Sequence, residues 1–259
     1  MRRYLSNYPV HPMAMAYAEG RNIYQNATRH LGKNIILKLD FREFFPSIKS
    51  IDWETFLKKD QKGNFTQIDV DTMTRILFWG RRNLSPDCLS IGAPSSPILS
   101  NILLYDLDVV LSELGSSRGI SYTRYADDIT VSGASKAEVL AFEVLARRAV
   151  GLMHSPRLSF NDEKRGLYDA GQRRMVTGLI LTPDGKVSIG RERKRTISAM
   201  LHQFSLGKLE IDQLSLLKGL VGFALGTEVS FIDSMRQKYG NELLDRVLKA
   251  PIMPRVPLR

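Results

Sequence analysis

Two short β-prone runs, residues 120–125 and 129–132, flank the tripeptide Ala126-Asp127-Asp128. Runs of β-branched and aromatic residues separated by so tight a connection predict an antiparallel hairpin. The connection contains no glycine, and it carries two adjacent carboxylates at the tip. This hairpin constrains the fold more than any other feature of the sequence, because it requires an antiparallel sheet with an acidic pair at one end of two strands.

A third carboxylate belongs to the same pattern. Asp40 follows the apolar run 34–39, which predicts a buried strand. Three carboxylates that converge in a partly dry site repel one another unless a cation joins them. Hard oxygen ligands select Mg²⁺ or Mn²⁺, and two such ions held together promote in-line phosphoryl transfer. The alternative is that each aspartate is a solvated turn residue, and the spacing alone leaves that alternative open.

The rest of the chain predicts an α+β core followed by a small helical module. The first 32 residues have helical character that Pro9 and Pro12 interrupt. Other predicted elements are a polar loop at 81–97, a short strand at 158–160 and a second hairpin that joins 175–181 to 186–189. The predicted helices are 52–59, 71–80, 96–115, 137–153, 191–204, 211–225, 228–239 and 241–248.

The charge balance indicates the class of partner. The 259 residues include 37 Lys and Arg against 27 Asp and Glu, which gives a formal net charge of +10. Such a balance favours a polyanionic partner, nucleic acid before a membrane surface. Cys88 is the only cysteine, which excludes an intramolecular disulfide and a cysteine-based zinc site. Since no apolar stretch approaches the length of a membrane span, we expect a cytoplasmic protein without a membrane partner.

Five motifs occur in an order that resembles the reverse transcriptases, and more narrowly their prokaryotic retron-type branch. One such motif alone is weak evidence, whereas five in the same order are strong. The resemblance runs from about Tyr8 to about Phe204. In chain order the motifs are NATRH (26–30), LDFREFFPSI (39–48), GAPSSPILSN (92–101), YADD (125–128) and VTGL (176–179).

This resemblance implies an RNA-directed DNA polymerase of right-hand architecture. It implies a palm with an antiparallel sheet, packed helices and partial fingers over residues 1–190, and a helical thumb over residues 191–259. Members of the family usually carry a fingers segment well upstream of the NATRH motif, whereas this sequence starts close to it. We therefore expect reduced fingers, with Arg2 and Arg3 as their remnant; a short natural form, a start site placed too late and a truncation are the alternatives.

The resemblance also implies the catalytic site. Asp40, Asp127 and Asp128 would hold two Mg²⁺ ions, with Mn²⁺ as the alternative metal, and the backbone carbonyl of Phe41 would add a ligand. Lys164 closes an N-x-x-K motif at 161–164. It would lie near the pyrophosphate leaving group as a general acid or an electrostatic stabiliser. A solvated surface lysine is the alternative.

Four residues would contact the incoming nucleotide by the same resemblance. Phe45 falls where the family carries an aromatic steric gate that selects dNTPs over ribonucleotides, and packing in the core is the alternative. Gly92, Ala93 and Pro94 form a loop that opens onto a helix, whose N-terminus lends positive potential to the approaching substrate. Ile91 replaces the glutamine that commonly precedes this glycine.

Two further groups would serve nucleic acid. Asn26 and His30, one helical turn apart, would brace local structure or guide RNA. Arg191, Lys194 and Arg195 share a helical face opposite an apolar one, so a basic stripe would follow the phosphates of the template–primer duplex. Solvated charge is the alternative for this stripe.

The resemblance finally implies the partners. They are a structured noncoding RNA that serves as template and primer, its cDNA, dNTPs and a separate effector protein in antiphage defence. Two other functions stay open at this point: a catalytically weak RNA-binding scaffold of a defence complex, and a group II intron or diversity-generating reverse transcriptase.

Overall fold

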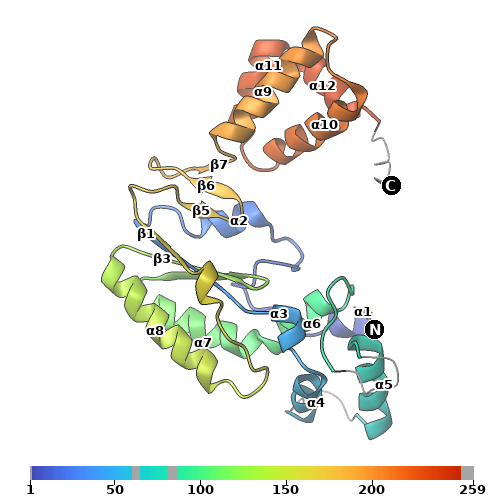
Figure 1. Cartoon of the computed structure of the whole chain (residues 1–259), viewed down its shortest axis with the longest axis vertical. Coiled ribbons are helices and arrows are strands. Elements are labelled where there is room, and N and C mark those ends of the chain that lie inside the picture. The colour runs from blue at the N-terminus through green and yellow to red at the C-terminus, as the bar shows by residue number, and fades with distance from the viewer. Residues whose placement is uncertain (1, 60–64, 81–86, 252–259) are drawn as a thin grey trace. The chain divides into compact units, whose positions relative to one another are not determined.

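The computed structural model describes residues 2–59, 65–80 and 87–251, and the side chains from residue 4 onward. Two compact units divide between Thr177 and Gly178, and each is described here by itself (Figure 1). The helical module that the sequence predicts begins at residue 191, after a short β-segment that belongs to the second unit. The assignment of residues 1–190 and 191–259 as palm and thumb stays a prediction.

The first unit is built on a four-stranded antiparallel sheet. Its strands are β1 (Ile35–Asp40), β2 (Ser121–Tyr125), β3 (Asp128–Gly133) and β4 (Gly166–Tyr168), in the spatial order β2-β3-β1-β4. The hairpin around the acidic pair and the strand that ends at Asp40 are both confirmed, and they are neighbours in the sheet. The strand expected at 158–160 is reduced to a single bridge between Phe41 and Phe160, because the chain then enters a 3₁₀ turn, η1 (Asp162–Lys164).

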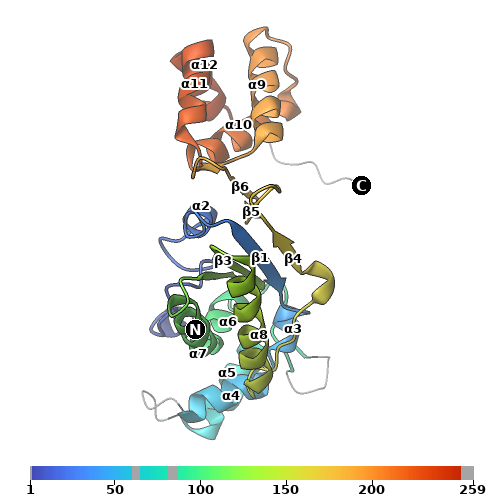
Figure 2. The same ribbon diagram turned by 90° about the vertical axis from the view of Figure 1, so that its left-hand side faces the viewer.

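Two helices, α7 (Tyr105–Ser116) and α8 (Lys136–Leu152), cover one face of this sheet (Figures 1 and 2). Leu37 and Val131 lie in register with Tyr122, whose ring lies 6.4 Å from that of Phe142 on α8. Because strand side chains alternate between faces, residues 38, 40, 128 and 130 point away from the helices. The sheet therefore has an apolar helical face and a polar face that carries the acidic residues.

The helix expected at 96–115 is wrong as a single element. The structure contains α6 (Ser96–Leu103) and α7, separated at Leu104, whose φ of −100° and ψ of 7° lie outside the helical range. The apolar spacing of Leu99, Ile102 and Leu107 continues across the break, and all three side chains are buried. Periodicity alone therefore could not reveal the bend.

The N-terminal segment is mostly irregular, so the expectation of helical character over the first 32 residues holds only for α1 (Arg2–Leu5) and α2 (Ile23–Thr28). Between them the chain runs beside β2: Arg124 N donates to Met13 O at 2.8 Å, and Met15 N donates to Arg124 O at 2.7 Å. Backbone pairing with a strand replaces helical hydrogen bonds here. This pairing places residues 13–17 next to the acidic hairpin.

Short helices complete the first unit: α3 (Phe44–Ser47), α4 (Ser50–Lys59) and α5 (Gln67–Leu77), the last capped by Thr66. The connection between α4 and α5 at 60–64 and residues 81–86 of the expected polar loop lie outside the described residues. A two-residue strand, β5 (Met175–Val176), lies beside α2 near the end of the unit. The apolar side chains of the sheet, of α4 to α8 and of Leu5 form one buried cluster.

The second unit begins with the antiparallel pair β6 (Leu179–Leu181) and β7 (Val187–Ser188), joined by the turn that the sequence predicts. Four helices follow, and all four are confirmed within two residues of their predicted ends: α9 (Arg191–Ser205), α10 (Ile211–Leu225), α11 (Val229–Tyr239) and α12 (Asn241–Lys249). Buried residues such as Leu201, Val221, Ile232 and Leu244 form their core. No helix in the described part of the chain is long and apolar enough to span a membrane.

Candidate active site

Asp40 and Asp128 are direct cross-strand partners. Asp40 is the last residue of β1, Asp128 is the first residue of β3, and the antiparallel register places them opposite each other. Side chains in such a position have Cβ atoms about 4.5–5.5 Å apart and point to the same face. Phe41 N also donates to Asp127 O at 3.1 Å, which ties the end of β1 to the hairpin turn. The structure thus brings together three acidic residues that are far apart in the sequence.

The electrostatics of this cluster show a deficit of positive charge. Burial raises the pKa of Asp127, and the neighbouring Asp40 carboxylate raises it further. Burial also raises the pKa of Asp128, with repulsion from Asp127 and Asp40 as the next causes. Both shifts mean that the folded protein resists ionising these carboxyl groups unless a cation compensates them.

Lys164 supplies one such cation. Its Nζ lies 3.1 Å from both carboxylate oxygens of Asp40 and donates a hydrogen bond to Oδ2, and this bond raises the pKa of the ammonium. The lysine side chain is 60% exposed and the Asp40 side chain is 7% exposed, so an exposed ammonium pairs with a buried carboxylate. Asn161 N donates to Asp40 O at 2.8 Å, which holds the segment that carries Lys164 against β1.

A cavity of about 390 Å³ opens beside the cluster. Asp40, Asp127 and Lys164 line it together with Phe45, so the structure places the expected steric-gate ring next to the carboxylates. The Phe45 ring is half-buried and tilts against Phe44 at 5.3 Å between centroids. Both a packing role and a contact with a sugar are compatible with this position, and the role of gate stays a prediction.

The expected nucleotide loop, Gly92 to Pro94, directly follows a residue that lines the cavity. Ile91, 78% exposed, lines it. Within the described ranges, Gly92, Ala93 and Pro94 are not part of the cavity wall, although they follow Ile91 directly. Gly92 has a φ of +90°, a conformation that favours glycine, and it turns the chain toward α6. Their contact with a nucleotide stays a prediction.

Tyr17 is a cavity residue that sequence reasoning missed. It is half-exposed, lines the same cavity, and has a φ of +60°, which is uncommon for a residue with a side chain. Burial raises its pKa, and the Asp127 carboxylate contributes to the shift. No local signal in the sequence marks this tyrosine, because its position depends on the pairing of residues 13–15 with β2.

Comparison with known proteins decides the family. Residues 2–177 match the family model described as reverse transcriptase (RNA-dependent DNA polymerase). The chain is 34% identical over 244 residues to the Escherichia coli retron Ec83 reverse transcriptase, covering 93% of this chain and 77% of that protein. This chain belongs to the retron reverse transcriptases. A second relative, the Escherichia coli retron Ec86 reverse transcriptase, is 31% identical over 95% of this chain and 74% of its own length.

Membership of this family confirms the α+β fold class as a polymerase palm and makes the retron reverse transcriptase an RNA-directed DNA polymerase. It favours a retron reverse transcriptase over the group II intron and diversity-generating alternative. Among solved structures, the foamy viral protease-reverse transcriptase in complex with RNA/DNA hybrid is 15% identical and superposes with a TM-score of 0.48. That match covers 95% of this chain and 31% of the viral one.

The donor set of this retron reverse transcriptase fits a divalent cation. Oδ1 of Asp40 is buried and has the Lys164 ammonium 3.1 Å away in an ion pair, but it accepts no hydrogen bond from any residue that the structure describes, and the two neighbouring carboxyl groups have raised pKa values. The described residues contain no group of three or more His, Cys, Asp or Glu side chains arranged to hold a metal unaided. Carboxylates that supply part of a shell, completed by substrate phosphates, are the usual way in which proteins bind Mg²⁺.

Asn26 and His30 of the retron motif are fully buried, and they brace the first unit. The His30 ring lies between Ser132 Oγ and Thr123 Oγ1, both at 2.8 Å, and burial lowers its pKa to about 3. Asn26 Nδ2 donates to Thr177 Oγ1 at 3.4 Å, so the NATRH and VTGL motifs meet. Nucleic-acid binding by these two residues stays a prediction, and burial means that it would act through the surface that they support.

The basic stripe on α9 is only partly open. Arg191 and Arg195 are exposed. Lys194 forms an ion pair with Glu228 at the start of α11, so part of its charge is already compensated. Arg193, which sequence reasoning left out, donates to Gly178 O and lies over the Phe223 ring, so it stabilises the second unit. The binding of template–primer by Arg191, Lys194 and Arg195 stays a prediction.

Proposed function

We propose that this enzyme adds dNTPs to a primer 3′-hydroxyl on a structured noncoding RNA template by two-metal phosphoryl transfer. In this proposal Asp40, Asp127 and Asp128 hold two Mg²⁺ ions, with a contribution from the Phe41 carbonyl. The observation that carries it is the opposition of Asp40 and Asp128 across β1 and β3 beside a cavity with excess negative charge. When bound, the ions would lower the pKa of the 3′-hydroxyl and stabilise the charge of the transition state.

The other cavity residues have separate roles in this proposal. Lys164, whose ammonium reaches the carboxylate cluster, neutralises charge on the pyrophosphate leaving group and donates a proton to it. Phe45 closes the wall on the sugar side and excludes a 2′-hydroxyl. Ile91 forms part of the wall past which the nucleotide enters, and the Gly92-Ala93-Pro94 loop that follows it contacts the nucleotide from outside the cavity wall.

Primer extension tests this function. The purified protein should extend a DNA primer on an RNA template with Mg²⁺ and dNTPs, and extension should stop when EDTA removes the metal. Asp127→Asn should lose extension by several powers of ten while it still binds the primer–template. Asp162→Asn, an exposed aspartate that pairs with Arg147, is the matched control and should keep the wild-type rate. Wild-type extension by Asp127→Asn would overturn the proposal.

Membership of the retron reverse transcriptases also supports a cognate noncoding RNA, an effector protein and a role in antiphage defence. We propose all three on that support. Sequencing the RNA that co-purifies with the enzyme should yield one structured transcript joined to, or paired with, its cDNA. Phage plating on cells that carry the locus with Asp127→Asn should show lost protection, and unchanged protection would contradict the defence role of DNA synthesis.

A further inference from the structure

A buried ion pair lies behind the acidic hairpin. Arg124, on β2, and Asp108, on α7, are both 0% exposed. The Arg124 Nε donates to Asp108 Oδ1 at 2.9 Å and Nη2 donates to Oδ2 at 2.6 Å, which forms a bidentate pair. Tyr122 Oη adds a third hydrogen bond to Asp108 Oδ1 at 2.7 Å. The carboxylate thus fixes the plane of the guanidinium.

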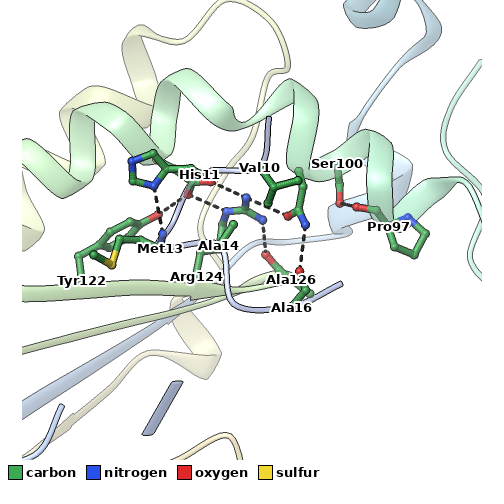
Figure 3. Close-up of polar contacts among 12 residues, drawn as sticks. Val10, His11, Met13, Ala14, Ala16, Pro97, Ser100, Tyr122, Arg124 and Ala126 are labelled. Atoms are coloured by element: carbon green, nitrogen blue, oxygen red, sulfur yellow. Dashed lines mark hydrogen bonds and ion pairs between the residues drawn. The ribbon is translucent and has the colours of Figure 1, made fainter. Parts of the chain in front are cut away.

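The remaining donors of Arg124 reach two other elements. Nη2 also donates to Asn101 Oδ1 on α6 at 3.1 Å, and Asn101 Nδ2 donates in turn to Ala16 O at 2.9 Å. Nη1 donates to Ala126 O at 3.2 Å (Figure 3). One buried guanidinium therefore links α6, α7 and the hairpin turn by hydrogen bonds. Through Asn101 it is also linked to Ala16, the residue that precedes Tyr17.

The turn that Arg124 contacts has a conformation that its sequence does not favour. Ala126 has a φ of +58°, in the left-handed region that glycine occupies readily and alanine does not. Asp127 follows it directly, and Asp128 then begins β3. A turn of this kind persists only where its surroundings hold it.

Stability alone does not account for this pair. A buried ion pair is generally no more stabilising than apolar residues of the same volume, because desolvation cancels most of the attraction. The guanidinium offers what an apolar residue lacks, a donor of fixed direction aimed at the Ala126 carbonyl.

We propose that Arg124 is a positioning residue that holds the Ala126–Asp127 turn in its left-handed conformation, and that Asp108 orients Arg124 for this purpose. The inference rests on the proposed catalytic role of Asp127 and Asp128. Loss of the Arg124 bond lets the turn relax away from the conformation that aims Asp127 at the cavity. Glycine at position 126 would adopt the left-handed conformation without strain, so the turn would no longer relax. The substitution should therefore restore the rate of nucleotide addition that is lost with the Arg124 hydrogen bond.

The test is a double-mutant cycle on the rate of single-nucleotide addition at saturating dNTP. Arg124→Lys keeps a positive charge beside Asp108 but loses the fork that reaches Ala126, and it should slow addition by about 100-fold, a typical cost of a misplaced catalytic group. The dissociation constant for primer–template should stay unchanged. Ala126→Gly in the Arg124→Lys background should restore about 5- to 30-fold, the factor that corresponds to the left-handed penalty of alanine. Its effect in the wild-type background should be clearly smaller.

Tyr122→Phe is the matched control, because it removes a hydrogen bond from Asp108 and leaves the Ala126 contact intact. It should lower the melting temperature without slowing addition. If Arg124→Lys does not fold, Arg124→Met combined with Asp108→Asn provides the second background, since it removes the donor to Ala126 without leaving a buried charge unpaired. Its slower addition should again be partly restored by Ala126→Gly.

Equal effects of Ala126→Gly in both backgrounds would overturn the inference, as would a wild-type rate in folded Arg124→Lys. A slowing of Tyr122→Phe in proportion to its lost stability would also overturn it, because the pair would then act through stability alone. Asp127→Asn separates this failure from that of the proposed function: its full activity would refute the role of the aspartates themselves.

Discussion

The structure predicts that the buried His30 makes the free energy of unfolding depend on pH, and it sets the size of that dependence. Its ring is fully buried and accepts or donates hydrogen bonds at 2.8 Å to Ser132 on β3 and Thr123 on β2. Burial lowers the pKa of His30 to about 3, whereas a histidine in an unfolded chain has a pKa of about 6.5. The unfolded chain therefore binds a proton between these pH values and the folded protein does not.

The stability of the folded protein should therefore fall as the pH is lowered. The folded pKa lies below the unfolded pKa, so the contribution of His30 to stability is fully present above about pH 6.5 and is lost as the pH falls toward 3. Each pH unit below 6.5 costs about 1.4 kcal/mol, so at pH 4.5 the loss is about 3 kcal/mol. A domain is typically stable by about 5–15 kcal/mol, and the loss is therefore easily measured.

Urea unfolding between pH 4.5 and 8 measures this loss. Fluorescence of Trp53 and Trp79, the two tryptophans of the chain, reports on the unit that contains His30. His30→Gln, which keeps a donor and an acceptor but does not titrate, is the reference. The carboxyl groups, and His11 with its lowered pKa, titrate in both proteins and cancel in the difference.

The two stability curves should keep a constant separation above pH 7. Below pH 6.5 the wild type should lose stability faster than His30→Gln, by about 3 kcal/mol in total at pH 4.5. Curves that stay parallel down to pH 4.5 would refute the reasoning, because His30 would then be free to take up a proton in the folded protein.

Three further predictions concern the proposed site. Phe45→Ala should reduce discrimination between dNTPs and ribonucleotides by about tenfold or more; unchanged discrimination would leave Phe45 a packing residue. Lys164→Ala should slow nucleotide addition by about 100-fold and Lys164→Arg by less, whereas equal rates in all three proteins would place Lys164 outside the reaction. In a plot of the logarithm of the RNA-binding constant against the logarithm of the salt concentration, Arg191→Ala and Arg195→Ala should each reduce the steepness of the slope by about one. An unaltered slope would mean that α9 does not contact phosphates.

Sequence reasoning succeeded where the signal is local. The helices of the second unit follow from apolar periodicity, and the acidic hairpin follows from two β-prone runs around one tight connection. The convergence of Asp40 with that hairpin could be expected only through the resemblance to a family, since nothing local pairs β1 with β3.

The features that sequence reasoning missed depend on tertiary contacts. Leu104 interrupts a continuous helical pattern, and Tyr17 reaches the cavity because its segment pairs with β2. Arg124 is indistinguishable in the sequence from an exposed strand residue, and its burial depends on Asp108 and Asn101 on two other elements. The burial of His30 likewise requires two hydroxyl groups from separate strands.

The central claim is that Asp40, Asp127 and Asp128 together hold the metal ions of the reaction. Electron paramagnetic resonance can count the Mn²⁺ ions per complex of enzyme, primer–template and a non-hydrolysable dNTP analogue, after the complex is separated from free nucleotide and free metal, with enzyme and primer–template alone as the baseline. We predict two ions above the baseline for the wild-type complex and at least one fewer for Asp127→Asn at the same occupancy of primer–template and nucleotide. Equal Mn²⁺ counts for the two proteins would contradict the account.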